Sequence, residues 1–318
     1  MISEAPGASS VAEVADLGPR RSTTAADILL ASGEARLRVA RLGAEARAWS
    51  IGGVQLLWPG DPAIWPDVSP VLFPIVGWTR DGVRVAGKRY DLSVHGFARR
   101  LGFEIEAVAA DFVRLVARDD DATRALYPFA FAFRVEHRLA LGSWEVALEV
   151  ENTGASPMPY ACGLHPGFNW PFAEAARDGA LFRFGSAERA EVPVIAPGGL
   201  FSKEMRPIPL VEGKTLPLDD ELFAREALCF LDAASCSARF EQADGSALEM
   251  RLDDFPHMAL WAKPGAPFLS LESWTGYGDP VGFAGDLYEK PGMRVLGQGE
   301  IARHGAVYRF HPAARAKT

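Results

Sequence analysis

Hydrophobic and polar residues alternate along much of the chain, a pattern typical of β-strands with one buried face. The segments 133–141 (FRVEHRLAL) and 144–154 (WEVALEVENTG) place hydrophobic or histidine side chains at alternate positions, from Phe133 to Leu139 and from Trp144 to Val150. Between them, the Gly-Ser pair at 142–143 predicts a two-residue hairpin turn. These two segments therefore predict a long antiparallel hairpin.

Shorter segments show the same strand pattern. Residues 83–92 predict two short strands around Gly87, 103–118 predict a hairpin, and 247–252 and 306–310 predict single strands. Helical periodicity is scarce, and 222–228 (LFAREAL) indicates a short helix at most. The 31 glycines and 23 prolines are spread along the chain instead of forming one linker. We therefore predict an all-β fold, a large antiparallel sandwich or barrel, with one domain over residues 25–318.

The first 24 residues differ from the rest because small and polar side chains dominate them, which favours a disordered tail. Arg20 and Arg21 resemble part of a twin-arginine export signal. However, only the short apolar run ILLA follows them, and acidic residues precede them, so export is disfavoured. No run approaches the ~18 apolar residues that a membrane helix needs.

Composition narrows the classes of partner. Hydrophobic residues make up 48% of the chain and the mean hydropathy is +0.01, as in globular proteins with a substantial core. The net charge of −8 argues against nucleic acid or an anionic membrane as the main partner, because both are bound through surplus Lys and Arg. Three scattered cysteines (Cys162, Cys229 and Cys236) form no disulfide framework. We therefore expect free thiols and a cytoplasmic location.

Three stretches place a titratable side chain among glycine, proline and aromatic residues. They contain His95 (SVHGFARR, 93–100), His165 (CGLHPGFNW, 162–170) and Glu272 (PFLSLESWTGYGDP, 267–280). Glu272 follows an apolar run, so we expect its carboxylate to emerge at the end of a strand, partly desolvated and with a raised pKa that suits a general base. Taken singly, a loop histidine is more often a surface or hydrogen-bonding residue, and a glutamate after a strand is usually solvated.

Other chemistries find little support in the sequence. His95 and His165 are far apart and neither has a second histidine at the short spacing typical of zinc or iron sites, so we predict no metal. Residues 297–302 (GQGEIA) loosely match a dinucleotide-binding fingerprint, but no βαβ unit fits after them. Phosphate-binding loops and nucleophile elbows are absent. The class of chemistry that remains is acid–base catalysis without a cofactor.

Three segments together resemble one known family. The bacterial branch of the aldose 1-epimerase, or mutarotase, family is similar to this chain in the order, spacing and local sequence of three segments. They are residues 69–105 (with LFPIVG and HGFAR), 163–172 (GLHPGFNWPF) and 268–280 (FLSLESWTGYGDP). The likeness extends from about residue 28 to the end. It implies a galactose mutarotase-like β-sandwich (supersandwich) with a sugar cleft on a concave sheet face. It also implies a cofactor-free enzyme that interconverts the α and β anomers of an aldose.

The resemblance also implies roles for the three titratable residues. His165 corresponds to the general acid at the ring oxygen, and Glu272 to the general base on the anomeric hydroxyl. His95 corresponds to a residue that binds and polarises the ring region. Elementary chemistry agrees with this division, because ring opening removes a proton from O1 while O5 gains one.

The chain departs from the family at one position. The family often has Arg directly after the glycine of PIVG, where this chain has Trp78. Arg80 or Arg99 can substitute, and strand alternation would keep Arg80 on the same side as residue 78. Trp78 itself either stacks on a sugar ring or belongs to the core.

Aromatic residues concentrate around the three acid–base candidates. They form either a platform for the sugar or ordinary sandwich core, and we favour the platform. The segment 216–228 also resembles a family segment near the cleft, which makes Asp219 or Glu221 a candidate for contact with a hydroxyl. The aromatic candidates for sugar binding are Phe168 and Trp274, with Phe97, Trp170 and Tyr277 nearby in the sequence.

The sequence thus favours a mutarotase that acts on a hexose or a hexose 6-phosphate, working as a monomer or homodimer. The alternative is a sugar-binding protein that has kept the fold without turnover, since fold does not fix function. A binding protein needs no matched acid and base, so the presence of both His165 and Glu272 favours the enzyme. A third hypothesis, a metal-dependent β-barrel enzyme, is disfavoured because the histidines lack the short spacing typical of metal ligands.

Overall fold

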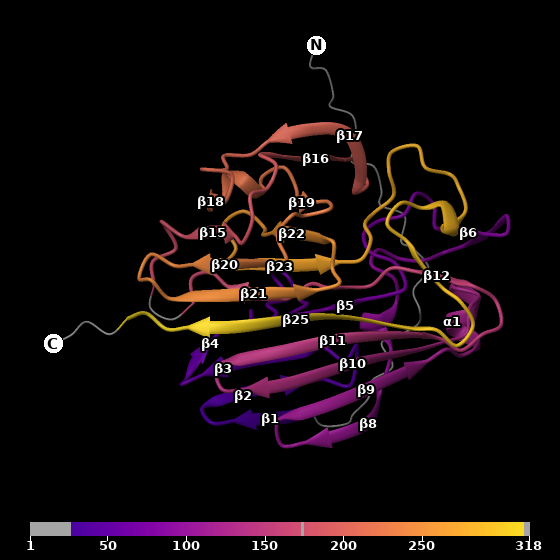
Figure 1. Ribbon diagram of the computed structural model, residues 1–318, viewed down its shortest axis with the longest axis horizontal. Helices are drawn as coiled ribbons and strands as arrows, with labels where there is room; N and C mark the ends of the chain where they lie inside the picture. Colours follow the sequence, from indigo (N-terminus) through magenta and orange to yellow (C-terminus); the bar gives the residue numbers. More distant parts are fainter. Residues whose placement is uncertain (1–26, 173–174, 315–318) are drawn as a thin grey trace, which may run out of the picture.

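The computed structural model describes residues 27–172 and 175–314, and these residues are mostly in β-strands (Figure 1). Every pairing between the named strands is antiparallel. The predicted antiparallel all-β class is confirmed. The predicted tail, residues 1–24, lies outside the described residues. Within the described part, the helical elements are α1 (Asp121–Leu126), η1 (Ala98–Arg100), η2 (Glu221–Phe223) and η3 (Leu287–Glu289).

A nine-stranded sheet crosses the whole molecule (Figure 1). Its long central strands come from segments far apart in sequence, so β25 near the C-terminus lies between β21 and β11. In spatial order the strands are β18 (Thr215–Pro217), β15 (Leu181–Phe184), β20 (Ser237–Glu241), β21 (Ala247–Asp253), β25 (Ile301–His311), β11 (Ser143–Asn152), β10 (Phe131–Ala140), β9 (Phe112–Arg118) and β8 (Glu104–Ala109).

A second sheet carries the segments that hold most of the candidate residues. Its order is β19 (Leu228–Phe230), β22 (His257–Trp261), β23 (Phe268–Trp274), β13 (Gly163–Leu164) and β5 (Val71–Leu72), and β14 (Gly167–Asn169) also pairs with β23. A four-stranded sheet joins β1 (Ile28–Ser32), β2 (Ala35–Val39), β3 (Ala46–Ile51) and β4 (Val54–Gln55). Three small sheets pair β6 (Val83–Val85) with β7 (Lys88–Tyr90), β12 (Met158–Tyr160) with β24 (Arg294–Leu296), and β16 (Glu191–Ala196) with β17 (Leu200–Pro207).

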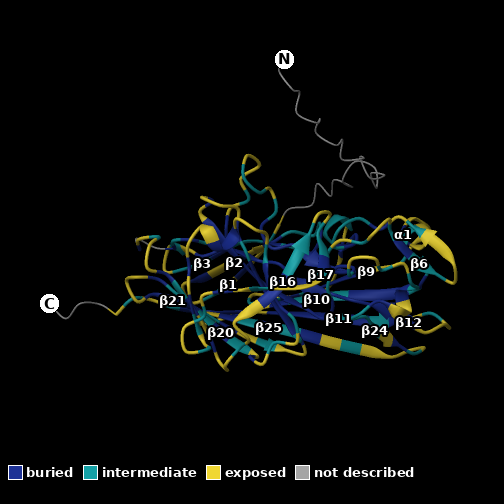
Figure 2. Ribbon diagram, turned by 90° about the horizontal axis from the view of Figure 1, so that it is seen from above, coloured by how far each residue is buried: buried dark blue, intermediate teal, exposed yellow. Residues whose placement is uncertain are grey.

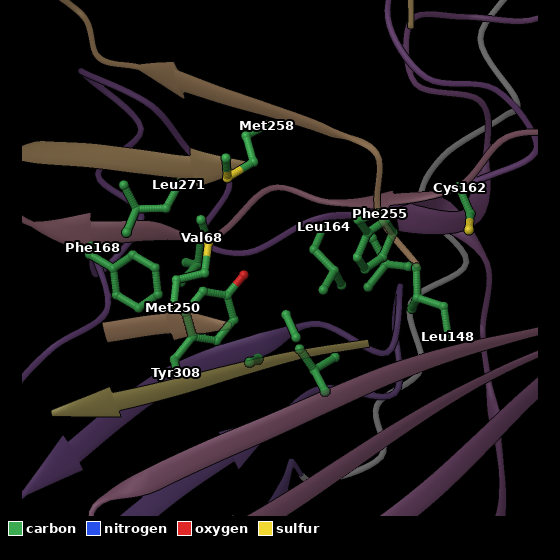
Figure 3. Close-up of a cluster of buried hydrophobic side chains, with 14 of the residues drawn as sticks. Val68, Leu148, Cys162, Leu164, Phe168, Met250, Phe255, Met258, Leu271 and Tyr308 are labelled. Atoms are coloured by element: carbon green, nitrogen blue, oxygen red, sulfur yellow. The ribbon is translucent and has the colours of Figure 1, made fainter. Parts of the chain in front are cut away.

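The main core lies where the nine-stranded sheet meets the other two large sheets. Figure 3 shows Tyr308 and Met250 of the nine-stranded sheet beside Phe168 and Leu271 of the second sheet. Phe168 also meets Trp49 of β3, with ring centroids 6.4 Å apart. Because all three sheets contribute to one buried cluster, the second sheet is held firmly against its neighbours.

The long predicted hairpin is confirmed as β10 and β11, which pair along their whole length. The alternating side chains all face the core: Phe133, Val135, His137, Leu139, Trp144, Val146, Leu148 and Val150 are buried. Burial is concentrated along these central strands, whereas exposed residues gather in the surrounding loops (Figure 2). The turn lies one residue earlier than predicted, at 141–142, because Ser143 already pairs with Ala140 and Gly142 takes the left-handed conformation.

Several shorter predictions are confirmed as well. The strand pairs β6–β7 and β8–β9 match the expected hairpins, and the strands at 247–252 and 306–310 lie within β21 and β25. In 222–228 helical structure is limited to the single turn η2, after which Leu228 begins β19. No helix among the described residues is long and apolar enough to cross a membrane. The three cysteines are free, with Cys162 and Cys229 buried and Cys236 exposed.

Replacing Gly96 tests how the loop that carries His95 is held. Gly96 has φ +69°, and an added Cβ would lie 2.3 Å from the carbonyl oxygen of Phe73. That oxygen accepts hydrogen bonds from the backbone of Phe97 and Ala98, so it cannot move away at low cost. Gly96→Ala should therefore lower the free energy of unfolding by about 2 kcal/mol or more, measured by urea denaturation.

Gly87→Ala is the matched control for this substitution. Gly87 has a similar φ of +77° but no atom within 4 Å of the added Cβ, so it isolates the backbone cost, about 1 kcal/mol. Equal losses of stability in the two variants would show that the contact with Phe73 does not constrain Gly96.

Candidate active site

A cavity of about 310 Å³ brings together most of the residues singled out in the sequence. His95, His165 and Glu272 all line it, although they come from a loop, from the link between β13 and β14, and from β23. The candidates for sugar binding that also line it are Arg99, Trp78 and Trp274. Three segments distant in sequence thus converge on one cavity.

His165 is held by strands on both sides of it. The backbone N–H of His165 donates to the carbonyl of Pro70 at 3.2 Å, while β13 and β14 before and after it both pair with β23. The flanking glycines are required by close approach, because a Cβ at Gly163 would lie 2.8 Å from the Ser273 carbonyl. A Cβ at Gly167 would lie 2.7 Å from the Trp65 ring. The backbone on both sides of His165 is therefore packed too closely to admit a side chain at either glycine.

Glu272 is buried and in direct contact with His165. Its Oε1 lies 3.2 Å from Nε2 of His165, and its Oε2 accepts a hydrogen bond of 3.1 Å from the Trp274 indole. The expected position at a strand end is wrong, because β23 continues to Trp274 and Glu272 is only 2% exposed. Burial raises the pKa of Glu272 well above its usual range, partly offset by the hydrogen bond from Trp274.

The environment of His165 lowers its pKa, whereas that of Glu272 is raised. Burial, with a smaller effect from the positive charge of Arg99, lowers the pKa of His165 to about 3. Its ring packs against two aromatic neighbours, with centroids 5.2 Å from Trp65 and 5.7 Å from Trp261. Its Nδ1 lies 2.8 Å from the hydroxyl oxygen of Ser270. Both shifts disfavour charge, so burial favours the neutral forms of the two groups, a protonated carboxyl beside a neutral imidazole.

His95 is fixed by two hydrogen bonds to Gly77. The backbone N–H of His95 donates to the Gly77 carbonyl at 3.0 Å, and the Gly77 N–H donates to Nδ1 of His95 at 3.1 Å. Because Nδ1 accepts, a neutral His95 carries its proton on Nε2. Desolvation, followed by the nearby His165 and Arg99, lowers the pKa of His95 well below its usual value. His95 is therefore a neutral N–H donor whose ring centroid lies 5.6 Å from that of His165.

Trp78 and Arg99 form other parts of the cavity wall. Trp78 was expected either to stack on a sugar ring or to belong to the core. Its side chain is 47% exposed, so it does not belong to the core. Its ring lies against Gly199, where an added Cβ would come within 2.0 Å of it. Arg99 Nη1 lies 3.5 Å from the Asp67 carboxylate, and its Nη2 donates to the Val94 carbonyl at 3.2 Å.

Three of the sugar-binding candidates do not line this cavity. Phe168 is fully buried against Trp49 and Tyr308, because its side chain points from β14 into the core. Arg80 is not in a strand, so the alternation argument does not apply, and its half-exposed side chain lies 3.9 Å from Asp81. Asp219 accepts the Leu222 N–H at the start of η2.

The structure adds lining residues that the sequence motifs did not contain. Trp65 and Asp67 come from the loop before β5, Trp261 from the end of β22, and Glu226 from the loop before β19. Glu226 has φ +75°, an uncommon value for a residue with a side chain. Within residues 27–172 and 175–314, no three His, Cys, Asp or Glu side chains are grouped to hold a metal ion.

Comparison with known proteins identifies the family. Residues 27–225 match the family model described as aldose 1-epimerase. Protein LacX of Lactococcus lactis subsp. lactis, in its plasmid form, is 30% identical over 251 residues, which cover 75% of this chain and 84% of LacX. The chain belongs to the aldose 1-epimerase family.

Solved structures support the fold of this family. A galactose mutarotase related enzyme from Lactobacillus acidophilus is 26% identical with a TM-score of 0.83, covering 91% of this chain and 98% of that protein. A galactose mutarotase-like protein from Lactobacillus casei ATCC 334 is 25% identical with a TM-score of 0.84, covering 90% of this chain and all of that protein. The expected galactose mutarotase-like fold is therefore confirmed.

Proposed function

We propose that this protein is an aldose 1-epimerase that interconverts the α and β anomers of a hexose by acid–base ring opening and reclosure. The contact of 3.2 Å between Nε2 of His165 and Oε1 of Glu272 carries this proposal. The two oxygens that exchange protons, O1 and O5, are bonded to the same carbon of the sugar. An acid and a base for this reaction must therefore lie side by side, as these two groups do.

The proton transfers balance within the pair. Glu272 takes the proton from O1 as the C1–O1 bond becomes a carbonyl, the C1–O5 bond breaks, and O5 takes the Nε2 proton of His165. Rotation about C1–C2 presents the other face of the carbonyl, and the reverse transfers close the ring. Burial favours the neutral pair, so in this proposal the cycle begins when the carboxyl proton of Glu272 moves to Nε2 of His165 across their contact.

The remaining lining residues have supporting roles in this proposal. His95 offers its Nε2–H to the ring region, and its neutrality avoids a second cation beside Arg99. The half-exposed indole of Trp78 offers an apolar surface on which a sugar ring can stack. The cavity volume of about 310 Å³ accommodates a monosaccharide.

Anomer-resolved NMR exchange with α-glucose, α-galactose and their 6-phosphates tests the function. We expect purified protein to accelerate the approach of at least one of these sugars to anomeric equilibrium. If none responds while a sugar still binds, the non-catalytic sugar-binding alternative takes the place of the enzyme.

Arg99→Ala separates the free from the phosphorylated substrates. Arg99 already contacts Asp67 and Val94, so we expect the variant to change KM for both kinds of sugar equally. A much larger rise in KM for the 6-phosphate would instead assign Arg99 to phosphate binding. Arg80→Ala, outside the cavity, is the control.

A further inference from the structure

Ser270 occupies a position behind His165 that the proton-transfer pair does not explain. It lies two residues before Glu272 on β23, so both side chains project from the same face of the strand. The residue is fully buried, and its hydroxyl oxygen lies 2.8 Å from Nδ1 of His165 and 3.1 Å from the carbonyl oxygen of Pro166.

The direction of the hydrogen bonds follows from which groups can donate. The Ser270 hydroxyl has one hydrogen, and the Pro166 carbonyl can only accept it. If that hydrogen points to Pro166, the serine oxygen accepts from Nδ1–H of His165, and Nε2 is left without a proton.

The other end of the contact is consistent with this direction. The Trp274 indole donates to Oε2 of Glu272, so a carboxyl proton belongs on Oε1, where it faces Nε2 of His165. Trp274, Glu272, His165, Ser270 and Pro166 then form one series in which each donor meets one acceptor and no buried polar atom of the series is left unpaired.

We propose that Ser270 is a positioning residue that fixes His165 in the tautomer with its hydrogen on Nδ1, so that Nε2 alone exchanges the catalytic proton. The catalytic part of this proposal rests on the proposed function. Its structural part, the tautomer, stands without it.

This arrangement serves both protonation states of the pair. When Glu272 holds the proton, neutral His165 keeps Nδ1–H and accepts at Nε2. When the proton has moved to His165, the imidazolium still donates Nδ1–H to Ser270, now as a stronger charge-assisted hydrogen bond. No tautomer change or side-chain rotation is needed between the two states, so the proton can pass back and forth in a preorganised site.

Nitrogen-15 NMR of the histidine rings in the free protein tests the tautomer directly. We expect His165 in the wild type to show a protonated Nδ1 and an unprotonated Nε2. In Ser270→Ala, Nδ1 loses its acceptor, and the Nε2–H tautomer should become populated. A wild-type spectrum with Nε2–H and a bare Nδ1 would overturn the proposal.

Kinetics of the same variants test the catalytic consequence. Ser270→Ala should lower kcat by about tenfold to a hundredfold, because it removes one partner of a buried hydrogen bond, with KM within about twofold of the wild type. Ser270→Thr keeps the hydroxyl and should restore both the tautomer and kcat. Ser273→Ala, an equally buried position on the opposite face of β23, should change neither.

The outcomes separate the two proposals. If Ser270→Ala folds like the wild type and keeps both its tautomer and its kcat, Ser270 has no positioning role. If the tautomer changes as expected but the wild type accelerates no sugar, the proposed function fails while the role of Ser270 in fixing the imidazole stands. If Ser270→Ala does not fold, the wild-type spectrum and Ser270→Thr decide between these outcomes.

Discussion

Glu272→Gln should lower the turnover of anomer interconversion by about 10²–10⁴-fold and leave sugar affinity nearly unchanged. The amide has the shape of the carboxylic acid and can still accept the hydrogen bond from Trp274, but it cannot take the O1 proton. Anomer-resolved NMR gives kcat. Quenching of tryptophan fluorescence gives the dissociation constant, because Trp78 and Trp274 line the cavity.

Glu226→Gln is the matched control for this prediction. Glu226 is also a carboxylate of the cavity wall, but it is exposed and is not paired with His165. Its substitution should alter affinity more than turnover. Turnover of Glu272→Gln within threefold of the wild type would assign the base to another group.

The long strands and the acid–base residues could be predicted from the sequence for different reasons. Alternation in 133–141 and 144–154 is a local property, and it identified the buried faces of β10 and β11 correctly. His95, His165 and Glu272 stood out through their motifs, and the structure brings all three to one cavity. The boundaries were less accurate: the turn was displaced by one residue, since local pairing of Ser143 decides where the strand begins.

Positions that depend on the three-dimensional course of the chain could not be predicted in this way. Phe168 was grouped with the sugar platform because it follows His165 closely, but β14 turns its ring into the core. Trp65 lies outside every motif and still contacts His165, because β5 and the loop before it lie beside β13. Proximity in sequence indicates which segments meet at a site, whereas packing decides which side chains enter it.

His165 illustrates how packing also sets chemistry that the sequence leaves open. The histidine motif indicated a rigid general acid, but burial lowers the pKa of this imidazole to about 3, so by itself it carries no transferable proton near neutral pH. Contact with Glu272, whose pKa is raised, supplies the proton that the imidazole lacks. The acid and the base are therefore properties of the pair and not of either residue alone.

His165→Asn should reduce turnover by about 10²–10⁴-fold, because asparagine has no titratable nitrogen at the position of Nε2. The same NMR assay measures this loss. His311→Asn is the control, since His311 lies at the end of β25, outside the cavity, and contacts Glu249. Turnover of His165→Asn near that of His311→Asn would remove His165 from the mechanism.

Combining His165→Asn with Glu272→Gln gives the sharpest test of the pair. Both residues serve one coupled transfer of protons, so once either is lost the other has little left to contribute. The double variant should therefore lose much less than the product of the two single losses, with turnover close to that of the slower single variant. Multiplicative losses in this cycle would mean that the two groups act in separate steps, and the proton shared across their 3.2 Å contact would then not be the one that the reaction uses.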